Sequence, residues 1–178
     1  MIKKLALIIG FIICLSSCGK DYVYRIEGEL SNLEDQTVYA VFEKDNYKVV
    51  DTVACTKPGQ FQIDQNEAGF HCVTIFFADK EHWVTAYLEP GETVKITGDA
   101  NSPLLLQVKG GRTNDKLTAF KKKIAPLLTE LTNLSNSLNS KDLNDTIEET
   151  DIAARLANVN MQLSEEAIRY VKENPNEE

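Results

Sequence analysis

The sequence contains few of the residues that form redox and metal sites. Its 178 residues include four cysteines and two histidines, and no two cysteines are separated by two residues. A dithiol site of thioredoxin type requires that C-x-x-C spacing, so these residues encode none. A structural zinc site takes four cysteine or histidine ligands, usually in paired spacings. Cys55, His71, Cys72 and His82 are scattered along the chain instead. We therefore expect no metal, no cofactor and no catalytic residue.

The sequence also lacks an apolar run long enough to cross a bilayer, which takes about 20 residues. A cationic start, Met1–Lys4, is followed by the shorter apolar segment Leu5–Leu15, as is typical of a secretory signal peptide. Leu15, Ser16, Ser17 and Cys18 come next and resemble the lipobox of bacterial lipoproteins. The resemblance implies cleavage before Cys18, attachment of a diglyceride to its thiol and acylation of the new amino group. The alternative is an ordinary signal peptide with a chance cysteine.

Basic residues are outnumbered by acidic ones, 19 against 27. Cleavage would remove residues 1–17 and leave 178 − 17 = 161 residues. Two of the lysines would be lost with them, so the net charge of the mature chain would be 17 − 27 = −10. Such an acidic surface argues against nucleic acid and against a polybasic membrane patch. We expect an exported protein held by lipid on Cys18, with residues 18–21 as a tether. It would face the periplasm or the cell exterior.

Cys55 and Cys72 are the cysteines that remain for other roles. An exported protein meets conditions in which disulfides form, and both residues lie in apparent strands, where a cross-strand bond is geometrically possible. The alternative is two buried free thiols, which pack as small hydrophobic side chains.

Residues 22–110 alternate between apolar and polar side chains at a period of two, which predicts β-strands. About eight short strands without helical interruption favour an antiparallel β-sandwich or a partly open barrel. The segment Phe70–Phe77 is nearly all apolar, so we expect a central strand buried on both faces. Trp83 and Tyr87 are candidates for an exposed ligand surface, although core packing is the commoner use of aromatic side chains.

After Gly110 and Gly111 the period changes to 3.6, which predicts helices over residues 111–175, with 176–178 as a tail. Pro126 should kink or restart the first helix, and Asn133–Lys141 is rich enough in Ser and Asn to connect two helices. Lys121–Lys123 is interpreted as a solvated face. The fold class is therefore α+β, with an antiparallel helical hairpin whose apolar stripe closes on itself, on the sheet or on a protein partner.

Several short motifs resemble a domain of unknown function at the N-terminus of lipid-anchored, thioredoxin-like and peroxiredoxin-related thiol-disulfide oxidoreductases. They are Tyr24–Gly28, Val50–Val53 before Gly59–Phe61, Leu88–Glu92, Gly98, and Gly110 and Gly111 with Asn114. The resemblance covers about residues 22–138 and extends more loosely to Tyr170–Pro175. Longer members continue into a domain with W-C-x-x-C, a motif that no position here matches.

Three functions fit these observations. The first is a lipid-anchored accessory or docking module of an envelope thiol-disulfide system, without a catalytic site in these residues. The second is the N-terminal part of an oxidoreductase whose catalytic domain lies beyond residue 178. The third is an envelope lipoprotein that binds a glycan or a peptide.

Overall fold

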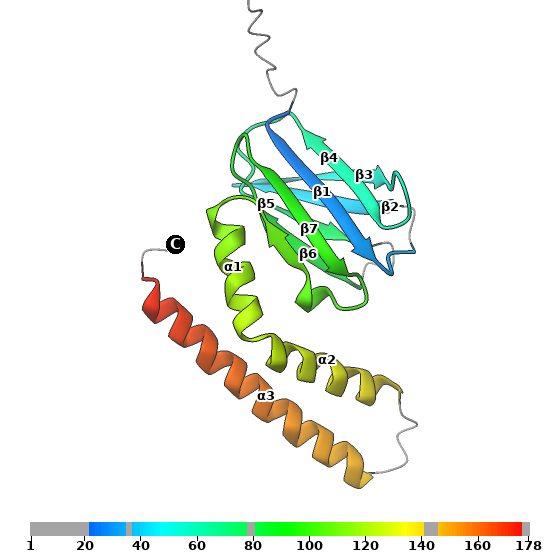
Figure 1. Cartoon of the computed structure of the whole chain (residues 1–178), viewed down its shortest axis with the longest axis vertical. Helices are drawn as coiled ribbons and strands as arrows, with labels where there is room; N and C mark the ends of the chain where they lie inside the picture. Colours follow the sequence, from blue (N-terminus) through cyan, green and yellow to red (C-terminus); the bar gives the residue numbers. More distant parts are fainter. Residues whose placement is uncertain (1–21, 35–36, 78–80, 141–145, 176–178) are drawn as a thin grey trace, which may run out of the picture.

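The computed structural model describes residues 22–34, 37–77, 81–140 and 146–175. The expected signal peptide 1–17, Cys18, the tether 18–21 and the tail 176–178 lie outside the described residues. Eight strands come first and three helices follow (Figure 1). The strands are β1 (Tyr24–Ser31), β2 (Thr37–Lys44), β3 (Tyr47–Ala54), β4 (Gln60–Gln65), β5 (Cys72–Phe76), β6 (Trp83–Tyr87), β7 (Thr93–Asp99) and β8 (Gln107–Lys109). This confirms the α+β class.

The strands form two four-stranded sheets, so the chain is a sandwich and the barrel alternative is wrong. Sheet A has the order β4-β1-β7-β8 and sheet B has the order β3-β2-β5-β6. The expectation of an entirely antiparallel fold was also wrong, because β1 and β7 pair in parallel, with Ile26 opposite Val94. Between these two strands the chain crosses to sheet B for β2 and β3, returns for β4, and crosses again for β5 and β6, which makes a parallel pair possible.

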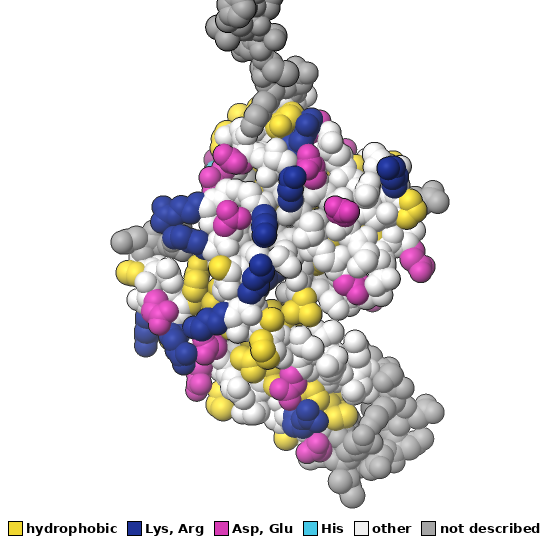
Figure 2. Space-filling model, viewed as in Figure 1, with side chains coloured by type: hydrophobic (Ala, Val, Ile, Leu, Met, Phe, Trp, Pro, Cys, Tyr) yellow, Lys and Arg dark blue, Asp and Glu magenta, His cyan; other side chains and the backbone are white. Residues whose placement is uncertain are grey.

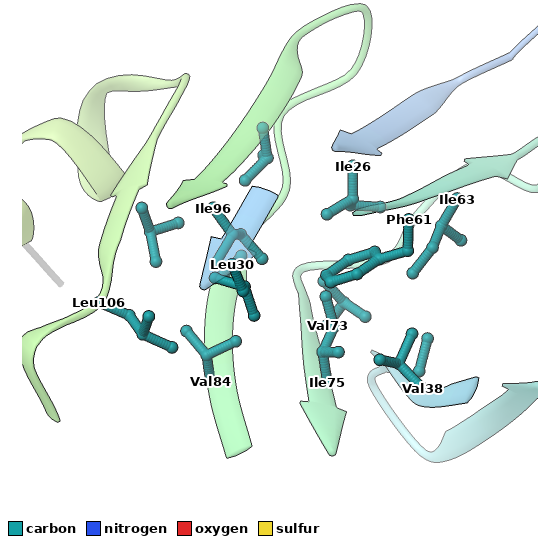
Figure 3. Packing of buried hydrophobic residues seen from close by; sticks show 14 of the residues in the cluster. Ile26, Leu30, Val38, Phe61, Ile63, Val73, Ile75, Val84, Ile96 and Leu106 are labelled. Carbon is teal, nitrogen blue, oxygen red and sulfur yellow. The ribbon is translucent and has the colours of Figure 1, made fainter. Parts of the chain in front are cut away.

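The hydrophobic core lies between the two sheets. It consists of the apolar side chains at every second position along the strands, which point inward. Apolar side chains such as Ile26 and Ile96 of sheet A meet Val38 and Ile75 of sheet B (Figure 3). Gly28, in the middle of β1, lies opposite Phe61 of β4 in the strand register. The ring of Phe61 occupies the space where a side chain at position 28 would start. The glycine of the Tyr24–Gly28 motif is therefore a packing position.

The apolar segment Phe70–Phe77 forms a central strand, as expected, but only one face of it is buried. Val73 and Ile75 point into the core and are 0% exposed, whereas Cys72, Thr74 and Phe76 are partly exposed. The expectation of burial on both faces was wrong, because none of the helices in the described residues covers the outer side of sheet B at this strand.

The helices are α1 (Arg112–Lys123), α2 (Ala125–Ser140) and α3 (Thr146–Glu173), and a short 3₁₀ helix, η1 (Pro103–Leu105), precedes β8. The break between α1 and α2 falls at Ile124, two residues before Pro126, as expected. The predicted connection Asn133–Lys141 was wrong, since α2 continues to Ser140. Ser137 donates its hydroxyl hydrogen bond to the carbonyl of Asn133 within the helix, at 3.0 Å.

The helices α2 and α3 pack as the expected antiparallel hairpin, and α1 is an additional element that joins them to the sandwich (Figure 1). Arg155 binds Glu130 at 3.2 Å, and Tyr170 lies against Phe120 with ring centroids 4.6 Å apart, so sequence numbers run in opposite directions along the contact. Leu134, Ile152 and Val159 form the buried centre of the hairpin. Among the described residues, none of the helices is both long and apolar enough to cross a membrane.

Candidate functional site

The outer faces of the two sheets differ in chemistry, and this difference points to one of them as a contact surface. The outer face of sheet A carries ion pairs: Arg25 donates two hydrogen bonds to Asp64, at 2.6 and 2.7 Å, and Lys95 lies 3.6 Å from Glu27. Charges of both signs alternate over this side of the molecule (Figure 2). The bonds from Arg25 hold the pKa of Asp64 below its ordinary value. A shallow groove of about 300 Å³ lies between Glu27, Gln62 and Lys95.

The outer face of sheet B carries aromatic and β-branched side chains over most of its area, with one ion pair, Lys48–Glu43 at 2.6 Å, at one end. The strand registers place the outward residues in rows across the sheet. One row holds Tyr39, Phe76 and Trp83, and the next holds Val50, Val41, Thr74 and Thr85, while Lys48, Glu43, Cys72 and Tyr87 form the third. We call these residues the aromatic face. Contiguous apolar patches on a protein surface often mark interaction sites.

Trp83 and Tyr87, the two residues singled out in the sequence, both lie on β6 at the edge of this face. Their side chains are 53% and 42% exposed, so they are surface residues and not part of the core. The indole of Trp83 packs against Phe76, with ring centroids 6.1 Å apart and planes tilted by 40°. This contact orients the ring while leaving about half of it open to a ligand.

The backbone of β6 adds a second binding element, because β6 is an edge strand of sheet B. At the two ends of the β5–β6 pair, Phe77 donates its N–H to the carbonyl of His82, and Leu88 donates its N–H to the carbonyl of His71. Since bonded and non-bonded pairs alternate in an antiparallel ladder, Trp83, Thr85 and Tyr87 direct their N–H and C=O groups away from β5. We call this the open side, because no described strand pairs with it, although α1 and η1 contact part of β6. Such groups can pair with an extended segment of another chain.

No disulfide joins Cys55 to Cys72 in this structure. The registers place Ala54 opposite Thr37 and Cys72 opposite Glu43, so the two cysteines lie near opposite ends of β2. They also lie on opposite sides of sheet B, since Cys55 packs against the core and Cys72 belongs to the aromatic face. A disulfide requires Cα atoms within about 7 Å, and positions near opposite ends of β2 on opposite sides of the sheet do not favour that approach.

Cys72 is poorly suited to thiolate chemistry where it lies. Partial burial raises the pKa of its thiol, and the neighbouring Glu43 carboxylate raises it further, against a smaller opposing effect of Lys48. Reactive cysteines have the reverse environment, because the thiolate is the nucleophile and positive charges favour it. The thiol is therefore mainly protonated at neutral pH.

The histidines do not meet the cysteines in a common site. His71 Nε2 lies 2.9 Å from Asp45 Oδ1 at the exposed turn after β2, and this hydrogen bond lowers the pKa of the Asp45 carboxyl. His82 directly precedes β6. In the part of the chain that the structure describes, no three His, Cys, Asp or Glu side chains are grouped closely enough to hold a metal ion.

Asn114 and Thr118 of α1 hold the helical arm on the sandwich, a role that the sequence patterns did not suggest. Asn114 is 2% exposed, accepts the N–H of Tyr87 at 2.9 Å and donates to the carbonyls of Tyr87 and Gly110 at 2.7 and 2.6 Å. Thr118 exchanges two bonds with the backbone of Val108. Asn114 thus pairs with the open side of β6 as a strand would. The available signal was a polar residue on the apolar side of the first helical turn.

The lysine run of α1 is only partly the solvated face that was expected. Lys122 and Lys123 are exposed, but Lys121 is partly buried, and burial lowers the pKa of its amine. The run spans most of a helical turn, so one of its members must face the protein.

Comparisons with known proteins identify the β-rich part of the chain. A family model described as "Domain of unknown function (DUF4369)" matches residues 24–117, which include all eight strands and the first half of α1, with Asn114. Neither the curated proteins nor the solved structures contain a match. Because the matched residues are more than half of the chain, the protein belongs to the family described as "Domain of unknown function (DUF4369)".

Proposed function

We propose that this protein is a lipid-anchored docking module of the cell envelope, without a catalytic site of its own, and that its aromatic face receives a protein partner. The observation that carries the proposal is the aromatic row Tyr39–Phe76–Trp83 beside the open edge of β6. The lipobox-like segment ending in Cys18 supports the anchoring. Export to the periplasmic or outer surface follows from the same segment.

The partner chemistry follows from what the face offers. Trp83 and Thr85 present backbone donors and acceptors on the open side of β6, and Trp83 and Tyr87 flank them with exposed rings. An extended segment with apolar side chains satisfies both, because main-chain bonds hold the segment while alternate side chains contact the rings. Asn114 already forms hydrogen bonds with the backbone N–H and C=O of Tyr87, so only a short part of the β6 edge is left for a partner. A short edge strand can bind a short peptide segment but disfavours edge-to-edge aggregation of whole sheets.

A thiol-disulfide partner is proposed because the motifs resemble the N-terminal domain of lipid-anchored thiol-disulfide oxidoreductases. The protonated Cys72 thiol supports a non-catalytic part in such a system, since Cys72 is on the contact face but poorly disposed to exchange. In the related alternative, the catalytic domain is encoded beyond residue 178, and the downstream reading frame would contain W-C-x-x-C.

Site-specific photo-crosslinking in living cells tests the docking proposal. A photoreactive phenylalanine analogue replaces Thr85 on the aromatic face or, as the control, Gln62 on the outer face of sheet A; both are exposed strand residues. We expect position 85, and not position 62, to give an adduct whose partner contains a thioredoxin-like domain. Trp83→Ala should reduce that adduct about tenfold or more, because the loss of an aromatic anchor at an interface costs about 2 kcal/mol.

Adducts of equal yield from positions 85 and 62, or none from position 85, would contradict protein docking at this face. A glycan ligand is the second candidate, because the Trp83 and Phe76 rings are placed as a stacking surface. A glycan array with the full chain in detergent, showing binding that Trp83→Ala removes, together with no protein adduct, would favour that candidate instead.

A further inference from the structure

The longest helix has a second apolar stripe that the packing of the arm leaves uncovered. On its inner side, α3 buries Ile152 and Val159 against α2. On its opposite side, Met161, Ile168 and Val171 are 56%, 55% and 65% exposed. With the exposed small residues Ala154, Ala157 and Ser164 they form what we call the outer stripe of α3.

The spacing of the outer stripe is that of a coiled-coil contact. From Ala154 to Val171 its members are separated by three, four, three, four and three residues, which are the a and d positions of a heptad. The stripe extends over about 25 Å of helix at 1.5 Å per residue. A helix that only covers its own domain needs one apolar stripe, so the second stripe fits a further helix.

The sizes of the side chains match a second copy of α3 in the antiparallel direction. If Met161 faces Ser164 of the other copy, then Ala157 faces Ile168 and Ala154 faces Val171, so each large side chain meets a small one. This alternation lets two helices approach evenly and fill the space between them. A parallel arrangement would place alanine on alanine and isoleucine on isoleucine, which leaves a gap at one end.

The polar residues beside the stripe favour the same direction. In the antiparallel register the e positions of the two copies meet, which places Asp151 beside Lys172 and Glu165 beside Asn158, each twice by symmetry. The g positions carry Ala153, Asn160 and Ala167, which are uncharged. A parallel pair would bring e beside g and form no opposite-charge contact. The contact is also self-complementary, as a two-fold dimer requires.

We propose that the protein forms a two-fold dimer through an antiparallel pairing of the outer stripes of α3. The partner is a second copy of this chain, and the dimer holds two sandwiches on one helical stem. This interface uses residues on α3 alone, so it is independent of the aromatic face and of the proposed docking function.

Cysteine cross-linking of the full chain in cells tests the dimer and its direction. Two differently tagged variants, Ala157→Cys and Ile168→Cys, are co-expressed, and a short thiol cross-linker is added to the membranes. We expect a product that contains both tags, because the two positions face each other in the antiparallel register. Each variant expressed alone, like the wild type with its native thiols, should stay near background. Cross-linking of each variant to itself, cross-linking to a different protein, or no product would overturn the proposal.

A charge placed on the stripe provides the second test. Ile168→Glu should weaken self-association of the detergent-solubilised full chain at least about a hundredfold in analytical ultracentrifugation, because two unpaired carboxylates would be buried. Leu104→Glu on η1 is the control, since Leu104 is an exposed apolar residue outside both α3 and the aromatic face. It should leave self-association unchanged. If both variants weaken self-association equally, or if Ile168→Glu does not weaken it, the dimer is contradicted. This result does not depend on whether the aromatic face binds a partner.

Discussion

Gly28→Ala is expected to lower the free energy of unfolding by about 2–3 kcal/mol, through overpacking of the sandwich core. A Cβ atom at position 28 would lie less than 3.0 Å from ring carbons of Phe61, which lies opposite in β4. Gly28 does not have a positive φ angle, so the backbone itself accepts alanine. The expected loss therefore comes from the ring and its buried neighbours. Urea unfolding of the protein, followed by tryptophan fluorescence, measures it.

A double-mutant cycle with Phe61→Leu isolates the cause. Leucine lacks the ring carbons that the new methyl group meets, so Gly28→Ala should cost less than about 1 kcal/mol in that background, and the coupling between the positions should exceed about 1 kcal/mol. If Gly28→Ala costs the same with and without the Phe61 ring, steric contact with Phe61 is not the reason for glycine in β1.

Asn114→Ala is expected to lower the free energy of unfolding by about 3 kcal/mol and to loosen the helical arm. The substitution leaves three backbone groups without their partner: the N–H and C=O of Tyr87 and the C=O of Gly110. A buried backbone group that loses its partner costs about 1–3 kcal/mol. Because these groups lie where α1 meets β6, cleavage by a protease near Gly110 and Gly111 should become faster.

Two further substitutions separate hydrogen bonding from helix propensity. Asn114→Asp keeps an acceptor for the Tyr87 N–H, but it places a carboxylate oxygen against the carbonyl oxygens of Tyr87 and Gly110. We therefore expect it to lower the free energy of unfolding at least as much as Asn114→Ala does. Thr113→Ala, on the exposed side of the same turn, should change the free energy of unfolding by less than about 0.5 kcal/mol. Near-wild-type stability of Asn114→Asp would rule out the donated bonds as the attachment of the arm.

Much of the fold followed from local patterns. Alternation placed Tyr24, Ile26 and Leu30 on the buried face of β1, and Pro126 placed the break between α1 and α2. The exposure of Trp83 and Tyr87 was also anticipated. These features depend on residues close together in the chain, whose periodicity or backbone chemistry acts locally.

The errors concern contacts between residues far apart, or local signals that distant packing overrides. The parallel pairing of β1 with β7 depends on how the chain crosses between sheets, which the alternation of either strand does not reveal. The Ser and Asn residues of Asn133–Lys141 resembled a connection, yet Leu134 is buried against α3 and keeps that segment helical. Asn114 was missed as an attachment because its partners are backbone groups, which leave no mark in the sequence.

Anchoring at Cys18 is tested most directly by labelling growing cells with radioactive palmitate. The wild-type chain and Cys14→Ala, whose altered cysteine lies within the apolar segment of the signal, should both incorporate label, and Cys18→Ala should incorporate none. Label in Cys18→Ala, or its absence from the wild type, would contradict a lipid anchor at this residue.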